Sequence, residues 1–200
     1  MVRLILFFVF ALVISAAIFA GQRVGEWPGA GSGSDPENTA AALIGGPFTL
    51  TDQHGNVVTE SILGDHWSVI YFGYTFCPDV CPLTLQNVSL AIEDLGGRGD
   101  RVQPIFISVD PWRDTPEVME FYAANFHPRM LALSGTPEQV AEAAASYRVF
   151  YAPTQKPDDP NFLVEHTSLL YVMGPDGRYV THISHTSSVE EIVAKLRELL

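Results

Sequence analysis

The chain has 200 residues, of which 47% are hydrophobic, and its formal net charge is −12. This length and composition fit one folded domain of ordinary core size with an appendage. The acidity argues against a nucleic-acid-binding protein, because phosphates attract Lys and Arg rather than Asp and Glu. A cationic partner surface would suit the charge, although acidity by itself mainly favours solubility.

The first segment is apolar enough to enter a membrane. Leu4 to Ala20 contains no charged residue, and Arg3 and Arg23 flank it. As a helix this segment would be about 26 Å long, slightly short of a hydrocarbon core of about 30 Å. A cleaved signal peptide is the alternative, with a candidate site at Ser15-Ala16-Ala17. We expect residues 1–23 to be an N-terminal membrane anchor or signal segment, so that the following chain lies across a membrane.

Residues 24–43 are expected to form a flexible linker, because they are rich in Gly, Ser, Ala and Pro and show no periodicity. The folded domain is expected over residues 44–200. Its first half has apolar runs typical of a hairpin, a buried central strand, a helix and a second buried strand. In chain order these are 48–50 with 57–59, Trp67 to Gly73, a helix with Leu85, Val88, Ile92 and Leu95 on one face that ends at Gly96-Gly97, and Ile105 to Val109.

The second half predicts two helices that open on Thr-Pro-Glu, a proline-rich exposed loop, a hairpin and a last helix. The first helix follows Thr115, with Val118, Phe121 and Tyr122 on one face, and a short strand spans Met130 to Leu133. The second helix follows Thr136, with Val140, Ala144 and Tyr147 facing inward. The remaining elements are the loop from Ala152 to Asn161, strands at Ser168 to Met173 and Arg178 to Ile183, and a helix with a capping box at Ser187 and Glu190.

This order of elements predicts an α/β fold, a mixed sheet with helices on both faces. It is the element order of a thioredoxin-like fold with an N-terminal β-hairpin and an inserted segment.

The chain has two cysteines, Cys77 and Cys81, each followed by proline at the junction of the central strand and the first helix. Such a pair can form a disulfide, exchange electrons with another dithiol, or bind a soft metal ion. An oxidising compartment permits the disulfide, but so short a bridge restrains little chain. Thiol-exchange sites more often use the spacing Cys-x-x-Cys.

The predicted topology brings a histidine to the cysteines. Cys77 follows one parallel strand, and His166 directly precedes a strand that runs the other way, so both belong to one edge of the sheet. Two thiolates and one imidazole form a soft set of three donors, which suits Cu(I), whereas structural Zn²⁺ usually takes four ligands. The positive end of the first helix favours thiolates, but it would equally activate redox cysteines.

Three segments resemble the signature sequences of the Sco/SenC family: Gly73 to Pro82, Ser108 to Thr115, and Glu165 to Thr167. The likeness covers roughly Ile44 to Leu200, and Glu165 stands where the family more often has Asp. The resemblance implies a membrane-tethered, thioredoxin-like copper chaperone that helps to assemble the binuclear CuA centre of cytochrome c oxidase. It implies that Cys77, Cys81 and His166 are the ligands of copper, as Cu(I) or Cu(II).

The implied partners are cytochrome c oxidase subunit II, through its CuA domain, and a chaperone that donates copper. The implied location is the cell inner membrane, with a single N-terminal anchor and the domain facing the periplasm, or the mitochondrial intermembrane space in a eukaryote. The alternative is a thiol–disulfide oxidoreductase that reduces the CuA cysteines. Asp79 and Asp110 could be weak oxygen ligands for Cu(II), could orient His166, or could be structural residues. Arg113 and Asp114 are expected to form a local ion pair and helix lead-in. His182 and His185 are expected to be structural or solvated, although they could exchange metal at the surface.

Overall fold

The computed structural model describes residues 44–155 and 161–200. The predicted anchor over residues 1–23 and the linker over 24–43 lie outside these residues. Within the two described ranges, no helix combines the length and the apolar composition needed to cross a membrane.

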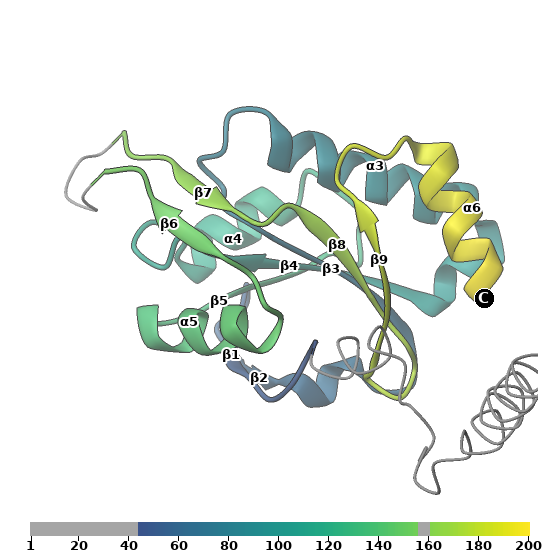
Figure 1. Ribbon diagram of the computed structural model, residues 1–200, viewed down its shortest axis with the longest axis horizontal. Helices are drawn as coiled ribbons and strands as arrows, with labels where there is room; N and C mark the ends of the chain where they lie inside the picture. Colours follow the sequence, from purple (N-terminus) through teal and green to yellow (C-terminus); the bar gives the residue numbers. More distant parts are fainter. Residues whose placement is uncertain (1–43, 156–160) are drawn as a thin grey trace, which may run out of the picture. The chain divides into compact units, whose positions relative to one another are not determined.

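Seven strands form a mixed sheet in the order β2-β1-β5-β4-β3-β8-β9 (Figure 1). The three inner strands β3, β4 and β5 are parallel, and the remaining neighbours are antiparallel. The bounds are β1 Thr49–Asp52, β2 Val57–Thr59, β3 Trp67–Gly73, β4 Val102–Ser108, β5 Leu131–Ser134, β8 Leu169–Met173 and β9 Tyr179–Ser184. The predicted α/β fold, with its N-terminal hairpin and central strand, is therefore confirmed.

Helices cover both faces of the sheet, with α3 and α6 on one side and α5 on the other (Figure 1). Successive residues of β3 serve the two faces, since Tyr71 contacts Cys81 of α3 while the ring of Phe72 lies 5.4 Å from that of Tyr147 at the end of α5. The bounds are α3 Val80–Asp94, α4 Pro116–Ala123, α5 Pro137–Ser146 and α6 Val189–Leu199, with short 3-10 helices η1 Glu60–Leu63 and η2 Gly96–Arg101. The buried, β-branched run of β3 is what a strand covered on both faces requires.

The N-terminal caps follow the sequence closely, with one shift. The side chains of Thr115 and Thr136 cap α4 and α5 as predicted, with proline at the start of each helix. The capping box of α6 is formed by Ser188 and Glu191, one residue after the predicted pair. Ile192, Val193 and Leu196 of this helix are buried.

The buried face of α4 differs from the prediction. Phe121 is 80% exposed and Val118 is 38% exposed, whereas Met119 and Ala123 are buried. Because the helix has only eight residues, its apolar residues cover most of its circumference and their spacing does not select one face.

The inserted segment contains a second, two-stranded sheet that the sequence did not predict. β6 (Tyr151–Pro153) pairs antiparallel with β7 (Val164–His166), and within the described residues these strands pair with each other rather than with the seven-stranded sheet. The predicted exposed loop from Ala152 therefore begins as a strand. Strands of three residues are too short to show an alternating pattern.

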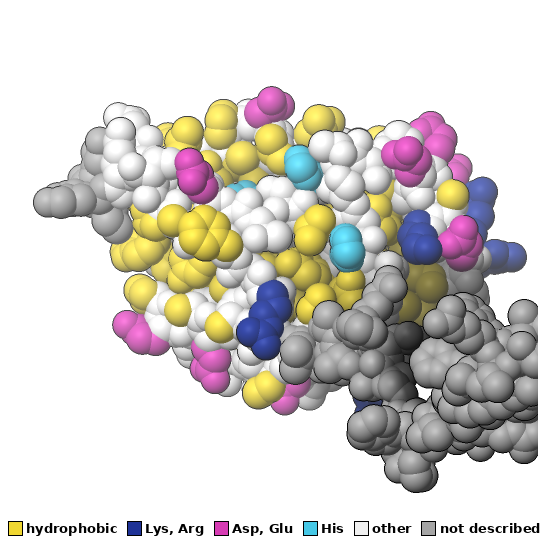
Figure 2. Space-filling model, viewed as in Figure 1, with side chains coloured by type: hydrophobic (Ala, Val, Ile, Leu, Met, Phe, Trp, Pro, Cys, Tyr) yellow, Lys and Arg dark blue, Asp and Glu magenta, His cyan; other side chains and the backbone are white. Residues whose placement is uncertain are grey.

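The surface view shows hydrophobic side chains across the middle of one face, with acidic side chains towards its margin and few basic ones (Figure 2).

Candidate metal and dithiol site

The site lies at the carboxyl edge of the parallel strands. β3 ends at Gly73 and β4 at Ser108, which are paired residues, and the Val109 N–H donates to the Gly73 carbonyl at 2.8 Å. The loops that follow these strands therefore start side by side, as expected in an open α/β sheet.

The first loop places the two sulfurs at the start of α3. Cys77 lies in a turn in which its N–H donates to the carbonyl of Tyr74, and Cys81 is the second residue of the helix. The Cys81 N–H donates to the Cys77 Sγ at 3.5 Å, so the Cys77 sulfur lies over the amino end of α3. Cys77 is half-buried, Cys81 is fully buried, and both are free thiols.

The two cysteines differ strongly in acidity. A hydrogen bond from the Cys81 thiol, together with the backbone N–H groups of Cys81 and Asp79, lowers the pKa of Cys77 to about 5. The hydrogen bond to Cys77, followed by burial, raises the pKa of Cys81. The reduced pair therefore holds one proton near neutral pH, on Cys81, while Cys77 is a thiolate.

His166 reaches this pair from β7 rather than from the main sheet. Its Nε2 lies 3.7 Å from the Cys81 Sγ, and its Nδ1 lies 3.1 Å from the carbonyl oxygen of Thr167. Because a carbonyl only accepts hydrogen bonds, Nδ1 carries the proton and Nε2 presents its lone pair towards the sulfur. Burial lowers the pKa of His166, which keeps the ring neutral.

Two tyrosines hold the imidazole ring edge to face. The rings of Tyr71 and Tyr74 lie 6.0 and 5.9 Å from that of His166, with interplanar angles of 73° and 90°. The Tyr71 hydroxyl also donates to the Cys81 Sγ at 3.7 Å. The sequence reasoning missed this contact, although Tyr71 lies on the face of β3 that meets α3.

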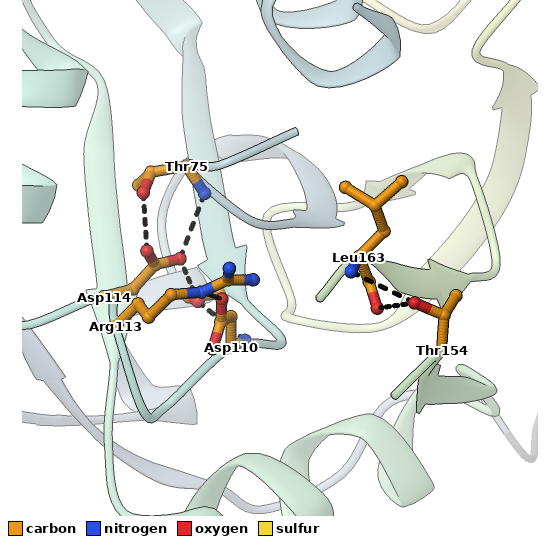
Figure 3. A network of polar contacts seen from close by, with 7 residues as sticks. Thr75, Asp110, Arg113, Asp114, Thr154 and Leu163 are labelled. Carbon is orange, nitrogen blue, oxygen red and sulfur yellow. Dashed lines mark hydrogen bonds and ion pairs between the residues drawn. The ribbon is translucent and has the colours of Figure 1, made fainter. Parts of the chain in front are cut away.

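The second loop is built on buried carboxylates. Asp114 accepts hydrogen bonds from the N–H and hydroxyl of Thr75 and from the Ser108 hydroxyl, and so ties this loop to the cysteine loop (Figure 3). Asp110 is fully buried and pairs with Arg113. The ion pair of this segment is therefore Arg113 with Asp110, and the geometry favours the structural interpretation of Asp110.

His182 and His185 form hydrogen bonds with groups other than the sulfurs. His182 accepts or donates a hydrogen bond at 2.6 Å with the Tyr179 hydroxyl, and His185 bonds the Ser168 carbonyl. Glu165, which stands where Asp was expected before the histidine, is exposed. In the part of the chain that the structure describes, no three His, Cys, Asp or Glu side chains already surround a common point closely enough to hold an ion. The side chains of Cys81 and His166 are the pair of candidate ligands that the structure brings together across the two loops.

The fold and the site together define an α/β protein whose paired cysteines lie beside a neutral histidine at the edge of a thioredoxin-like sheet. The family model described as SCO1/SenC matches residues 36–200, and the chain belongs to this family.

Named relatives and solved structures support this assignment. The chain is 41% identical to the SCO2-like protein RP587 of Rickettsia prowazekii over 75% of its own length and 74% of that protein. It is 38% identical to the mitochondrial SCO1 homolog of Homo sapiens over 77% of its length, which is 52% of the human protein.

Two solved structures of similar proteins are described in terms of copper binding and of a disulfide switch. The structure of Bradyrhizobium japonicum ScoI with copper bound matches with a TM-score of 0.72 and 43% identity, over 78% of this chain and 99% of that one. BsSco, described as a member of the Sco family of cytochrome c oxidase assembly proteins with a disulfide switch, matches with a TM-score of 0.62 and 25% identity, over 78% and 93% of the two chains.

Proposed function

We propose that this chain binds one copper ion through Cys77, Cys81 and His166 and delivers it to the CuA site of cytochrome c oxidase. The observation that carries the proposal is the separation of 3.7 Å between the Cys81 Sγ and the His166 Nε2. With metal bonds of about 2.3 Å to sulfur and 2.0 Å to nitrogen, as in zinc sites, a ligand angle of about 120° separates the two donors by roughly this distance. Trigonal coordination requires that angle, and Cys77 supplies the third donor.

The protonation states favour a soft ion. Cys77 is already a thiolate and His166 is already neutral, so binding has to displace one proton, from Cys81. Two thiolates and an imidazole suit Cu(I), and Cu(II) is accepted by the same sulfur and nitrogen donors.

Delivery follows from the unequal burial of the two sulfurs. Cys77 is half-buried and Cys81 lies behind it, so an incoming thiolate from an acceptor meets the Cys77 side of the ion first. The acceptor is the CuA domain of subunit II, and a second chaperone supplies the copper. The copper-bound and oxidase-assembly relatives support this assignment. Residues 1–23 tether the domain to the inner membrane on the periplasmic side, or to the intermembrane-space side in a mitochondrion.

Copper titration of the reduced protein tests the proposal. We expect one copper per chain, and Cys77→Ser, Cys81→Ser and His166→Ala each to weaken binding by at least about a hundredfold, beyond the loss typical of outer-shell substitutions. His182→Ala is the matched control, because His182 bonds Tyr179 instead. Unchanged affinity in the three variants would refute the assignment.

A second candidate is a thiol–disulfide oxidoreductase, favoured by the lowered pKa of Cys77 beside the Cys81 thiol. The Cys77 thiolate would attack one sulfur of an acceptor disulfide and release the other as a thiolate. Cys81, after losing its proton, would then attack Cys77, which closes the Cys77–Cys81 disulfide and frees the second acceptor thiol. The acceptor gains two electrons and the pair loses two.

His166→Ala separates the two candidates. It removes a copper ligand but neither sulfur of the exchange reaction. Loss of oxidase assembly in cells with dithiol exchange intact supports copper delivery. Retained assembly, with reduction of the CuA cysteines by the purified protein, supports the reductase.

A further inference from the structure

The hairpin that carries His166 is not part of the main sheet. β6 and β7 hydrogen-bond to each other, with Tyr151 opposite His166, and within the described residues neither strand joins the ladder that positions the cysteines. An isolated two-stranded hairpin is marginally stable in water. The position of the imidazole relative to Cys81 therefore depends on side chains that dock the hairpin.

Phe162, two residues before β7, is a buried side chain at the loop end of this hairpin. It is 1% exposed, and its ring meets that of Trp112 edge to face at 6.1 Å. The Thr154 hydroxyl donates to the Leu163 carbonyl and accepts from the Leu163 N–H, which continues the pairing of the two strands into the connecting loop (Figure 3). Phe162 therefore packs the loop end of the hairpin against the loop after β4.

Arg113 joins the hairpin to the cysteine loop. Its guanidinium carbon lies 3.7 Å from the ring centroid of Phe162 and 4.6 Å from that of Phe76, the residue before Cys77. Both distances are within the range of cation–π contacts, which strengthen when the cation is desolvated. The Arg113 guanidinium thus contacts both the cysteine loop and the segment that leads into the His166 strand.

The Arg113 guanidinium is itself held in place by the loop after β4. The Arg113 Nε donates to the buried carboxylate of Asp110 (Figure 3). The Asp110 N–H in turn donates to the Ser108 hydroxyl at the end of β4. Arg113 is therefore fixed to the main sheet while it stacks on both loops.

We propose that Arg113 is a positioning residue that clasps the His166 hairpin to the cysteine loop by stacking on Phe162 and Phe76. The clasp sets the distance between the His166 imidazole and the sulfurs. Its significance for copper rests on the proposed function, whereas the docking of the hairpin does not.

Two variants remove the stacking in different ways. Arg113→Lys keeps the positive charge and a partner for Asp110 but replaces the planar guanidinium with a compact ammonium. Phe162→Leu keeps an apolar side chain in the pocket and leaves Arg113 unchanged. Arg178→Lys is the matched control, because Arg178 is exposed and pairs with Asp176 in the turn after β8.

Hydrogen exchange of the reduced, copper-free protein tests the docking. The Thr154 and Thr167 amides, which bond across the hairpin to Leu163 and Phe150, should exchange at least about tenfold faster in both variants, because an undocked hairpin opens readily. The amides of β3 and β4 should not change. Unchanged hairpin exchange in both variants would overturn the clasp, whatever the outcome for copper.

Copper binding then tests positioning by a double-mutant comparison. Arg113→Lys should weaken copper affinity about tenfold, as outer-shell changes do. It should also weaken the coupling of the imidazole nitrogen to Cu(II) in the electron paramagnetic resonance spectrum. In the His166→Ala background the same change should have no further effect. An equal loss in both backgrounds, or faster hairpin exchange with unchanged affinity, would show that Arg113 does not act through His166. A wild-type protein that binds no copper would refute the proposed function while leaving the exchange result to decide the clasp.

Discussion

At the scale of single residues, the proton shared by the cysteine pair controls reactivity. The thiolate is the nucleophile, and the pKa of Cys77 of about 5 keeps this sulfur ionised down to that pH. We expect iodoacetamide to label Cys77 and spare the buried Cys81, with a rate that falls only as the pH drops through about 5. Peptide mass spectrometry of the reduced protein, labelled across a pH series, measures this profile.

The same experiment on Cys81→Ala examines the cause. Removing the Cys81 thiol removes the first hydrogen bond that lowers the pKa of Cys77. The midpoint of labelling should then rise towards the value of about 8.5 found for a free thiol. A midpoint near this higher value in the unaltered protein would contradict the account.

Gly73 leaves room for the Cys81 sulfur. A Cβ at this position would lie 2.9 Å from the Cys81 Sγ and 2.9 Å from a ring carbon of Phe106. We expect Gly73→Ala to lower the free energy of unfolding by about 1–3 kcal/mol, as overpacking does, and to displace the sulfur. Gly97→Ala is the control, since its Cβ would meet nothing within 4 Å. Equal urea midpoints for the two variants would show that the strand does not confine the sulfur.

At the scale of elements, the cap of α6 can be tested at two adjacent serines. The Ser188 hydroxyl accepts from the Glu191 N–H, and the Glu191 carboxylate accepts from the Ser188 N–H. Ser188→Ala should therefore cost about 1 kcal/mol of stability in chemical denaturation. Ser187→Ala should change it by less than about 0.5 kcal/mol, as for surface positions without a special role. The reverse ranking would restore the capping pair inferred from sequence.

Long periodic elements and the N-terminal hairpin could be predicted from the sequence, whereas the short hairpin of β6 and β7 could not. The seven-residue buried run of β3 and the apolar spacing of α3 each exceed one structural period, so their patterns are unambiguous. β7 has three residues, so its pattern says nothing of pairing, and His166 was expected to lead directly into β8. The expected meeting of His166 with the cysteine edge nevertheless agrees with its distance from Cys81.

The contacts around the site were less predictable than the residues themselves. The contacts of Tyr71 with Cys81 and of Arg113 with Phe162 join side chains from separate loops and strands. Such contacts depend on tertiary packing, which propensity and periodicity do not describe.

At the scale of the whole molecule, apolar side chains gather on the segments that carry the site. They belong to the cysteine loop and the start of α3, the loop after β4, and the His166 hairpin with its approach, and all are more than a third exposed. We call them the apolar rim: Phe76, Val80, Leu83, Trp112, Phe150 and Leu163. In an acidic protein of charge −12, such a rim is the kind of surface that a partner covers.

The rim predicts a variant that separates copper binding from copper delivery. Phe150 and Leu83 are 64% and 58% exposed, and the backbone of Phe150 already bonds that of Thr167 beside His166. Truncating both to Ala should leave copper affinity unchanged and weaken docking to the CuA domain about tenfold, since one buried aromatic anchor is worth more than about 1 kcal/mol at an interface. Transfer measured at increasing CuA-domain concentration reports the docking strength.

Phe121→Ala is the control for that experiment, because Phe121 is more exposed than any residue of the apolar rim but lies away from it. The Oε1 atom of its neighbour Glu120 lies 3.7 Å from the Nδ1 atom of His54. His54 is in the turn that joins β1 to β2, at the end of the sheet opposite the cysteines. If loss of exposed apolar area alone slowed transfer, Phe121→Ala would do so as well. A transfer rate that falls only in the rim variant, and recovers at high CuA-domain concentration, assigns the effect to docking, whereas equal rates in all three proteins would mean that copper passes without contact at the rim.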